Sequence, residues 1–332
     1  MASPQSAIAP MSPEEARQQR RDRNTHVTAA EARDIYDVRF AALYDDLYFY
    51  KDTEAATLVS KAGLQPGMFV LDLGTGTGAV ARAADRAVGP LGFVAAVDIS
   101  MPMLQVAFAK GGWANVGFGY LDAHGLQNEI GEVATVENFV NIMPSDRRHR
   151  FVDFRGFDRI LALGLYNDIE VAQRPAVLRR WASLLAPGGV LVYESFPLTR
   201  DLATVVFRDL TRQHEYAWPG TAKTRIWLAA AESFDRAFQD GEQAATAAGL
   251  TAVNKGRMCK KEKFFDAFST EILPTAERRW QRSVRHHDGT MPHQFLENEK
   301  RRCYEREKGI AVSKGWQMTH QTAAVVLEVK LT

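Results

Sequence analysis

The sequence predicts an α/β fold: a doubly wound, mainly parallel seven-stranded sheet with helical lid insertions. Three observations support this prediction. A glycine-rich loop directly follows the apolar run Val70–Leu73, and apolar runs then alternate with helical segments over about residues 60–255. These runs are apolar almost without interruption, as in parallel strands that helices cover on both faces of a sheet.

Seven apolar runs are the expected strands. In chain order they are Val70–Leu73, Phe93–Val97, Val116–Tyr120, Phe157–Leu163, Val190–Glu194, Leu250–Val253 and Ala323–Val329. Helices are expected over Ala29–Tyr50, Thr53–Ala62, 79–88, Pro102–Lys110, 171–185 and 229–248. The stretch of roughly 60 residues before the last strand is too long for a turn in a compact domain, so we expect it to form a lid or an added subdomain.

The composition excludes several classes of protein. The chain has 332 residues, of which 46% are hydrophobic and 24% charged, as is usual for a globular enzyme. Its net charge of +1 provides no field that would recruit nucleic acid or a membrane surface. Cys259 and Cys303 lie far apart and outside any metal-ligand spacing, which favours a reducing, cytoplasmic compartment and no metal site. We expect a monomer or a homodimer.

The loop Asp72–Gly78, with glycine at every second position from Gly74, is the most informative stretch. Glycine lets the backbone turn tightly and approach a ligand closely. The spacing from Gly74 to Ala79, with Asp98 about 20 residues further on, fits a dinucleotide site. Asp72 would repel a pyrophosphate and instead suits S-adenosylmethionine, which carries an ammonium and a sulfonium group. A plain role for Asp72 is also open, as a cap for the N–H groups of the loop.

Five segments in this order resemble the motifs of class I S-adenosylmethionine-dependent methyltransferases of the small-molecule type. They are Asp72–Gly78, Asp98, Asp122–Ala123, Phe157–Leu163 and Leu185–Gly189. The resemblance implies that the cofactor, S-adenosyl-L-methionine, lies across the carboxyl ends of the strands. Together with Tyr44 of the helix expected to cover the methionine end of the cofactor, the expected cofactor-binding residues are Asp72, Gly74, Thr75, Gly76, Gly78, Asp98, Ile99, Met103, Asp122, Ala123 and Leu163.

The same resemblance gives roles to two of these acids. Asp98 would accept hydrogen bonds from the ribose hydroxyls, although it could instead cap the helix that begins near Ser100. Asp122 would accept the adenine amino group, although a solvated turn acid is the plainer interpretation. Tyr166 and Asn167 follow the fourth strand and are expected to face the transferred methyl group. His214 is a candidate base.

The expected acceptor is an apolar or aromatic small molecule, and O-methylation is the expected reaction. The motifs of amino-methylating and C5-methylating nucleic-acid enzymes are absent, because Gly164–Asp168 lacks the Pro-Pro-Tyr pattern and neither cysteine follows a proline. Aromatic residues in the two insertions suit a cover over such a molecule. Two alternatives stay open: a non-methylating protein that binds the cofactor, as a cyclase or a regulatory binder, and, more remotely, an NAD(P)-dependent oxidoreductase suggested by Tyr304 and Lys308.

The expected organisation has four parts. Residues 1–27 form a flexible arm, and residues 28–63 form a helical cover. The cofactor-binding core consists of residues 64–199, 229–259 and 321–332. Residues 200–228 and 260–320 are the substrate lid insertions.

Overall fold

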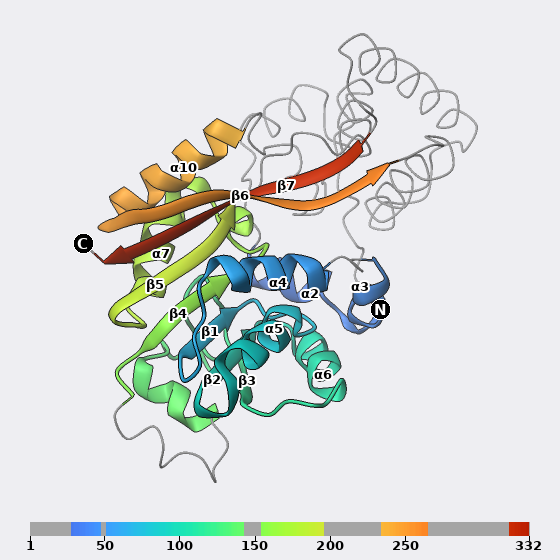
Figure 1. Ribbon diagram of the computed structural model, residues 1–332. Helices are drawn as coiled ribbons and strands as arrows, with labels where there is room; N and C mark the ends of the chain where they lie inside the picture. The colour runs from blue at the N-terminus through green and yellow to red at the C-terminus, as the bar shows by residue number, and fades with distance from the viewer. Residues whose placement is uncertain (1–27, 48–50, 143–153, 196–233, 265–318, 332) are drawn as a thin grey trace, which may run out of the picture.

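The computed structural model describes residues 28–47, 51–142, 154–195, 234–264 and 319–331. Seven strands form one sheet in the order β3-β2-β1-β4-β5-β7-β6 (Figure 1). Their bounds are β1 Phe69–Leu73, β2 Phe93–Asp98, β3 Val116–Tyr120, β4 Phe157–Ala162, β5 Leu185–Ser195, β6 Leu250–Phe264 and β7 Thr319–Leu331. The first five strands are parallel, and β7 runs antiparallel to both β5 and β6. The predicted fold class is therefore confirmed.

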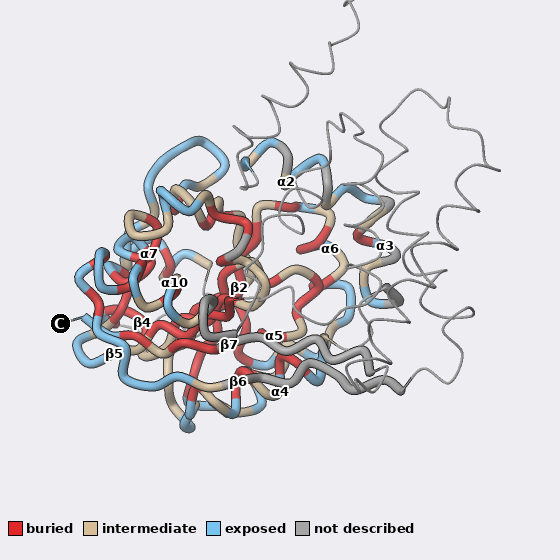
Figure 2. Tube along the Cα trace, turned by 90° about the horizontal axis from the view of Figure 1, so that it is seen from above, coloured by how far each residue is buried: buried red, intermediate tan, exposed pale blue. Residues whose placement is uncertain are grey.

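Helices cover both faces of the sheet. On one face α4 (Lys51–Lys61) and α5 (Ala79–Val88) enclose a buried cluster that includes Val70 and Val192. On the other face α7 (Arg174–Ala182) and α10 (Phe234–Ala247) pack on the larger cluster, which includes Leu71 and Tyr193. Figure 2 shows the buried residues running along the strands between these two helical layers. Chain order reverses between β1 and β4, and open α/β sheets bind their ligands beyond the carboxyl ends of strands at such a point.

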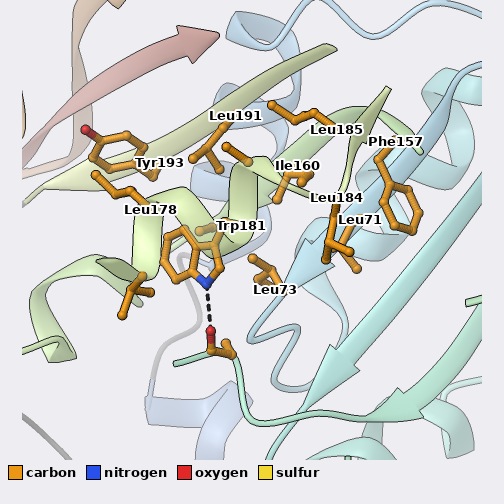
Figure 3. Packing of buried hydrophobic residues seen from close by; sticks show 14 of the residues in the cluster. Leu71, Leu73, Phe157, Ile160, Leu178, Trp181, Leu184, Leu185, Leu191 and Tyr193 are labelled. Atoms are coloured by element: carbon orange, nitrogen blue, oxygen red, sulfur yellow. Dashed lines mark hydrogen bonds between the residues drawn. The ribbon is translucent and has the colours of Figure 1, made fainter. Parts of the chain in front are cut away.

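Trp181 of α7 anchors the larger cluster. Its ring is fully buried among leucine, isoleucine and phenylalanine side chains from β1, β4 and β5 (Figure 3). Its indole Nε1 donates a hydrogen bond of 2.6 Å to the carbonyl oxygen of Ala123, which follows β3. A buried indole N–H needs such a partner. The bond therefore ties the loop after β3 to the helical layer.

The helix expected over Ala29–Tyr50 is wrong as one element. It divides into α2 (Ala29–Ile35) and α3 (Val38–Leu47), and Asp37 lies at the break. The Asp37 carboxylate accepts a hydrogen bond of 2.8 Å from the N–H of Phe40, which is the capping interaction that starts a new helix. The helix expected over 171–185 is also shorter, because a 3-10 turn at Val171–Gln173 precedes α7.

The last two strands are longer than predicted. Their pairing runs from Leu250 with Leu331 to Phe264 with Thr319, so residues 260–264 and 319–320 belong to the sheet and not to a lid insertion. β5 begins at Leu185, because the turn expected there is a bulged extension that pairs with Phe157. The expected insertions at 200–228 and 265–318 lie outside the described residues. Within the described ranges, none of the helices could cross a membrane.

One further α-helix and two further 3-10 segments lie in the stretches that follow β2, β3 and β4. α6 (Met101–Ala109) follows β2, and its N-cap is Ser100, whose hydroxyl accepts a hydrogen bond from the N–H of Met103. A 3-10 segment at Val136–Ile142 follows β3. A further 3-10 turn, Tyr166–Asp168, directly follows β4.

Candidate functional site

The loop between β1 and α5 forms the centre of the site. Its N–H groups at Gly74 and Thr75 both donate to the carbonyl oxygen of Val97, each at 2.9 Å, so the loop is tied to the end of β2. Gly76 has φ +57, and a Cβ added there would meet nothing within 4 Å. At Gly78 the same atom would lie 2.9 Å from the ring of Trp113. Gly78 therefore allows close packing within the protein, whereas Gly76 faces open space.

Asp98 at the end of β2 holds this loop in place. Its Oδ2 accepts a hydrogen bond of 2.8 Å from the N–H of Gly76, and its Oδ1 accepts one of 2.8 Å from the N–H of Ser100. Burial raises the pKa of the Asp98 carboxyl, and the two backbone hydrogen bonds oppose that rise. Asp98 therefore contributes indirectly to the cap of α6, because it accepts a hydrogen bond from the N–H of Ser100, the N-cap residue.

Asp72 lies beneath the same loop and is almost fully buried. Its Oδ2 accepts a hydrogen bond of 2.6 Å from the hydroxyl of Thr75, while its Oδ1 has no hydrogen-bond partner among the described residues. Burial raises the pKa of the Asp72 carboxyl to about 7, against the lowering effect of Thr75, and the nearby Asp98 adds to the rise. A buried carboxyl group with an unsatisfied oxygen favours a positively charged or hydrogen-bond-donating ligand.

The residues expected around the adenine lie beyond β2 and β3. Asp98, the last residue of β2, pairs with Tyr120, the last residue of β3. Asp122 lies two residues beyond that strand end. The Asp122 Oδ1 accepts a hydrogen bond of 3.0 Å from the N–H of His124, which stabilises this turn. Ala123 is buried, Met103 is buried, Ile99 is half-buried, and Leu163 is half-buried beyond β4. The structure thus brings the expected cofactor residues to one edge of the sheet.

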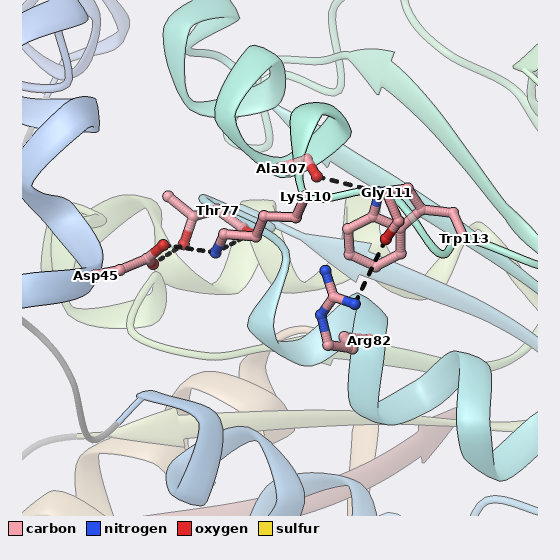
Figure 4. A network of polar contacts seen from close by, with 7 residues as sticks. All are labelled: Asp45, Thr77, Arg82, Ala107, Lys110, Gly111 and Trp113. Atoms are coloured by element: carbon pink, nitrogen blue, oxygen red, sulfur yellow. Dashed lines mark hydrogen bonds and ion pairs between the residues drawn. The ribbon is translucent and has the colours of Figure 1, made fainter.

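The helices before β1 contact this edge through polar groups that the sequence analysis missed. Asp45 of α3 accepts a hydrogen bond of 2.6 Å from the Thr77 hydroxyl and forms an ion pair of 2.7 Å with Lys110 (Figure 4). The Lys110 ammonium also donates to the Thr77 carbonyl oxygen at 2.8 Å. No local pattern in the sequence links Asp45 with Lys110, because the two residues meet only when α3 docks beside α6.

Two further contacts hold the same helices. The Ser100 hydroxyl donates a hydrogen bond of 2.6 Å to the carbonyl oxygen of Tyr36, and Arg33 donates one of 2.9 Å to the Tyr120 hydroxyl. Tyr44 packs edge-on against Tyr36 and Phe40, with ring centroids 6.4 Å and 5.8 Å away. α2 and α3 therefore contact the residues that follow β1 and β2 and the last residue of β3.

Tyr166 was expected to face the transferred methyl group, and the structure places its side chain in the buried interior. It is fully buried, its ring centroid is 4.7 Å from that of Tyr193, and the Arg174 guanidinium lies 4.5 Å above it. Its hydroxyl donates a long hydrogen bond of 3.5 Å to the Asp240 carbonyl oxygen, and burial raises its pKa to about 12. This environment makes Tyr166 a packing residue between β5, α7 and α10.

The other two expected catalytic groups cannot be placed. Asn167 lies in the 3-10 turn Tyr166–Asp168, but its side chain is outside the described part of the chain, and so is the whole of His214. Charged side chains that the sequence analysis did not select are present nearby: Lys51 and Glu54 of α4, and Glu194 of β5. Among the described residues, no three His, Cys, Asp or Glu side chains form a group that could hold a metal ion.

Comparison with known proteins identifies relatives of this chain. Residues 48–241 match the family model of a methyltransferase domain. The ubiquinone/menaquinone biosynthesis C-methyltransferase UbiE of Shewanella sp. strain ANA-3 is 32% identical over 139 residues, which cover 42% of this chain and 46% of that protein. UbiE of Hahella chejuensis is also 32% identical over 139 residues, covering 42% of this chain and 47% of its own length. The chain thus aligns with about half the length of the curated relatives it matches.

A solved structure shares the fold. One chain of a complex that contains the Haloferax volcanii Trm112 methyltransferase activator superposes with a TM-score of 0.51 at 14% identity. The superposition covers 91% of the present chain and 98% of the other.

Proposed function

The chain belongs to the methyltransferase-domain family, the class I S-adenosylmethionine-dependent methyltransferases, and from this membership we propose that it methylates a small apolar or aromatic molecule on oxygen. The observation that carries the proposal is the pairing of the buried Asp98 carboxylate with the N–H of Gly76, beside an open space at Gly76. That arrangement holds a glycine loop ready for close approach by a ligand.

The residues present fit S-adenosylmethionine. Each oxygen of Asp98 accepts one hydrogen bond, Oδ2 from the N–H of Gly76 and Oδ1 from the N–H of Ser100, and each keeps a further lone pair that the ribose hydroxyls would use. The free Oδ1 of Asp72 and the space at Gly76 suit the cationic methionine end of the cofactor. Asp122 and Ala123, in the turn after β3, would contact the adenine. When bound, the cofactor supplies an electrophilic methyl group.

The protein's own part in the reaction is positioning. Methyl transfer needs the acceptor atom in line behind the methyl group at near-attack distance, and a rigid edge of the sheet provides such a frame. The loop after β1 is fixed by hydrogen bonds to Val97, Asp98 and Lys110, so its backbone does not need to reorganise when the ligand arrives. Exclusion of water would strengthen the interactions that hold the two reactants.

We propose that α2 and α3 are the cover over the cofactor. They contact Thr77, Ser100, Lys110 and Tyr120, which surround the expected cofactor edge, and Tyr44 lies among their aromatic side chains. A chain that lacks residues 1–50 should keep a folded sheet but lose most of its affinity for the cofactor, whereas removal of residues 1–27 alone should have no effect. Unchanged cofactor binding and turnover without residues 1–50 would show that these helices only pack.

Carbon is the second candidate acceptor atom. The curated relatives are named as C-methyltransferases of ubiquinone and menaquinone biosynthesis, and the aligned segment has 32% identity. Both candidates use an aromatic acceptor and both release a proton, so the same site suits either. Mass spectrometry with NMR of the product separates a methyl ether from a ring-methylated phenol. The small net charge of the chain fits such an acceptor better than nucleic acid.

A thermal-shift panel with S-adenosylmethionine, S-adenosylhomocysteine, NAD and NADP tests the cofactor. We expect stabilisation by the first two only, because a ligand that binds the folded state alone raises the unfolding temperature. Stabilisation by NAD or NADP alone would favour the oxidoreductase alternative. The acceptor is then sought by incubating fractionated metabolites with methyl-labelled cofactor. Cofactor binding without any label transfer would favour a non-methylating binder.

A further inference from the structure

Helix α7 holds the turn that follows β3 through two consecutive carbonyl groups. The indole N–H of Trp181 donates a hydrogen bond of 2.6 Å to the carbonyl oxygen of Ala123 (Figure 3), and the Arg180 guanidinium donates one of 3.2 Å to the carbonyl oxygen of His124. Trp181 is fully buried, whereas Arg180 is exposed. Two neighbouring side chains of one helix therefore fix the direction of two neighbouring peptide groups in this turn.

The peptide group between Ala123 and His124 connects Trp181 with Asp122. The described ranges contain no cis peptide bond, so the C=O of Ala123 and the N–H of His124 point in opposite directions. The C=O is directed at Trp181, and the N–H is directed at the Asp122 carboxylate, whose Oδ1 accepts it at 3.0 Å. The hydrogen bond to Trp181 therefore sets the direction of the N–H group that holds Asp122.

The backbone of this turn is determined by its surroundings. Asp122 and Gln127 exchange two backbone hydrogen bonds, of 2.8 Å and 3.2 Å, that close the turn. Leu126 has φ +51, and no other residue except glycine has a positive φ in the part of the chain that the structure describes. A leucine keeps such a conformation only where packing imposes it, and the Leu126 side chain is buried in the same cluster as Trp181. Packing on the α7 side of the sheet thus selects the shape of the turn.

The Asp122 carboxylate follows a segment that adjoins the expected ribose-binding acid. The N–H of Leu121 donates a hydrogen bond of 3.0 Å to the carbonyl oxygen of Asp98, so the backbone that enters the turn lies beside the end of β2. Asp122 accepts the N–H of His124 through one oxygen, and an ionised carboxylate can accept further donors. The exocyclic amino group of adenine is such a donor. Hypoxanthine has a carbonyl oxygen at that position, which would face the carboxylate as a second acceptor.

We propose that Trp181 and Arg180 are positioning residues for recognition of the adenine base. They fix the direction of the peptide groups after Ala123 and His124, and the first of these groups holds the Asp122 carboxylate where it accepts the amino group of the base. The inference rests on the proposed function, in which Asp122 contacts adenine. A tryptophan in the core of the protein thereby contributes to the choice between adenine and hypoxanthine.

Calorimetric titration with two ligands tests this assignment. The ligands are S-adenosylhomocysteine and S-inosylhomocysteine, its analogue with hypoxanthine in place of adenine, and the measured quantity is the ratio of their dissociation constants. We expect wild-type protein to prefer the adenine ligand by about tenfold or more, because the analogue replaces a hydrogen bond to a charged group by a mismatch. Trp181→Phe keeps an aromatic ring but removes the N–H, and it should reduce the preference about fivefold. A purely structural role for Trp181 would weaken both ligands equally and leave the ratio unchanged.

Arg180→Ala and Arg179→Ala form a matched pair. Both side chains are exposed on α7 and donate to backbone carbonyl groups, but Arg179 donates to the carbonyl oxygen of Ala247 at the end of α10, at 2.9 Å. Arg180→Ala should reduce the preference about twofold, and Arg179→Ala should leave it unchanged. Because both arginines are exposed, this pair decides the question even if Trp181→Phe does not fold.

Asp122→Ala shows whether the effect passes through Asp122. This variant should lose the preference itself, and Trp181→Phe in the Asp122→Ala background should then change the ratio no further. The proposal is overturned if wild-type protein binds the two ligands equally, if neither Trp181→Phe nor Arg180→Ala lowers the ratio, or if Arg179→Ala lowers it as much as Arg180→Ala. Failure of wild-type protein to bind S-adenosylhomocysteine at all would instead overturn the proposed function, so the two failures are distinguishable.

Discussion

The carboxylate of Asp98 and the N–H of Gly76 are joined by a hydrogen bond of 2.8 Å that connects the end of β2 to the glycine loop after β1. The two residues are 22 positions apart in the chain, and β1 and β2 are adjacent and parallel. Of the three glycines in the loop, the bond fixes the one at which an added Cβ would meet nothing within 4 Å. The geometry of the loop therefore depends on the carboxylate that we propose to bind the ribose of the cofactor.

Asp98→Ala should weaken S-adenosylmethionine binding by about 2–3 kcal/mol, because two charge-assisted hydrogen bonds to the ligand are lost. Isothermal titration calorimetry measures the affinity, and circular dichroism checks the fold. Asp85→Ala is the matched control, since Asp85 accepts hydrogen bonds from the N–H groups of Ala114 and Asn115 away from the loop. Wild-type affinity in a folded Asp98→Ala variant would remove the ribose-binding role.

Gly76→Val should abolish cofactor binding. The residue has φ +57, which a β-branched side chain resists, and the new side chain would occupy the space left for the ligand. Gly63→Val is the control, because Gly63 has φ +61, nothing within 4 Å of an added Cβ, and a position after α4. It carries the same backbone strain and should retain binding. Equal losses of affinity in the two variants would mean that strain alone explains the effect.

Asp45→Ala should accelerate release of S-adenosylhomocysteine several-fold while changing the unfolding free energy by less than about 1 kcal/mol, because exposed ion pairs contribute little to stability. The substitution removes the hydrogen bond from Thr77 and the ion pair with Lys110, both of which hold α3 over the loop. Stopped-flow fluorescence measures the release rate. Asp45→Asn retains an acceptor for Thr77 and should show a smaller effect. If neither variant alters the release rate, α3 does not help to retain the cofactor.

Cofactor affinity should increase with pH through about pH 7 in the wild-type protein. The Asp72 carboxyl has a pKa of about 7, so it is mostly neutral at pH 6 and charged at pH 8. A positively charged ligand prefers the charged form, and the resulting change is up to about tenfold per pH unit below the pKa. Asp72→Asn should bind with an affinity that lacks this dependence. Any titration of the ligand itself affects the wild-type protein and the variant equally. Parallel curves of affinity against pH for the two proteins would therefore show that Asp72 is not the group responsible.

The same group makes a prediction about stability. The folded-state pKa of Asp72 lies above the ordinary value of 3.8, so the folded protein holds the proton more tightly than the unfolded chain. That stabilisation is fully present below pH 4 and is lost as the pH rises through about 7, at a cost of a few kcal/mol. Asp72→Asn should remove this loss. Urea unfolding at pH 5 and pH 8 therefore should show a smaller pH difference in the variant than in the wild type.

The local pattern of residues was sufficient for the first three strands, of which β1 and β2 are almost wholly buried. β1, β2 and β3 lie within one residue of their expected bounds, because continuous apolar runs between turns have few other solutions. The break at Asp37 was missed because apolar spacing continues across it, and only the capping hydrogen bond to Phe40 shows it. The long pairing of β6 with β7 was missed because the sequence from Asn254 to Lys263 is mostly polar and charged and gives no apolar strand pattern.

The candidate site divides in the same way. The sequence was enough to place Asp72, Gly76 and Asp98 together at strand ends and in one loop, and their roles in binding the cofactor stay predictions. Tyr166 was expected at the acceptor and is a packing residue, because the turn after β4 directs it toward Tyr193 and Arg174. The position of a residue just after a strand predicts where its backbone lies. It does not predict the direction in which its side chain points.

The sequence by itself determined the parallel sheet, the glycine loop and the acids at the ends of β1 and β2, because these depend on short-range periodicity and on backbone freedom at glycine. Only the tertiary structure decided that Asp45 meets Lys110 and that Lys51 lies with Glu194 beside Gly164. These residues are 65 and 143 positions apart in the numbering of the chain. Their contacts depend on strand order and on the way α3 and α4 dock, which no local pattern of residues specifies.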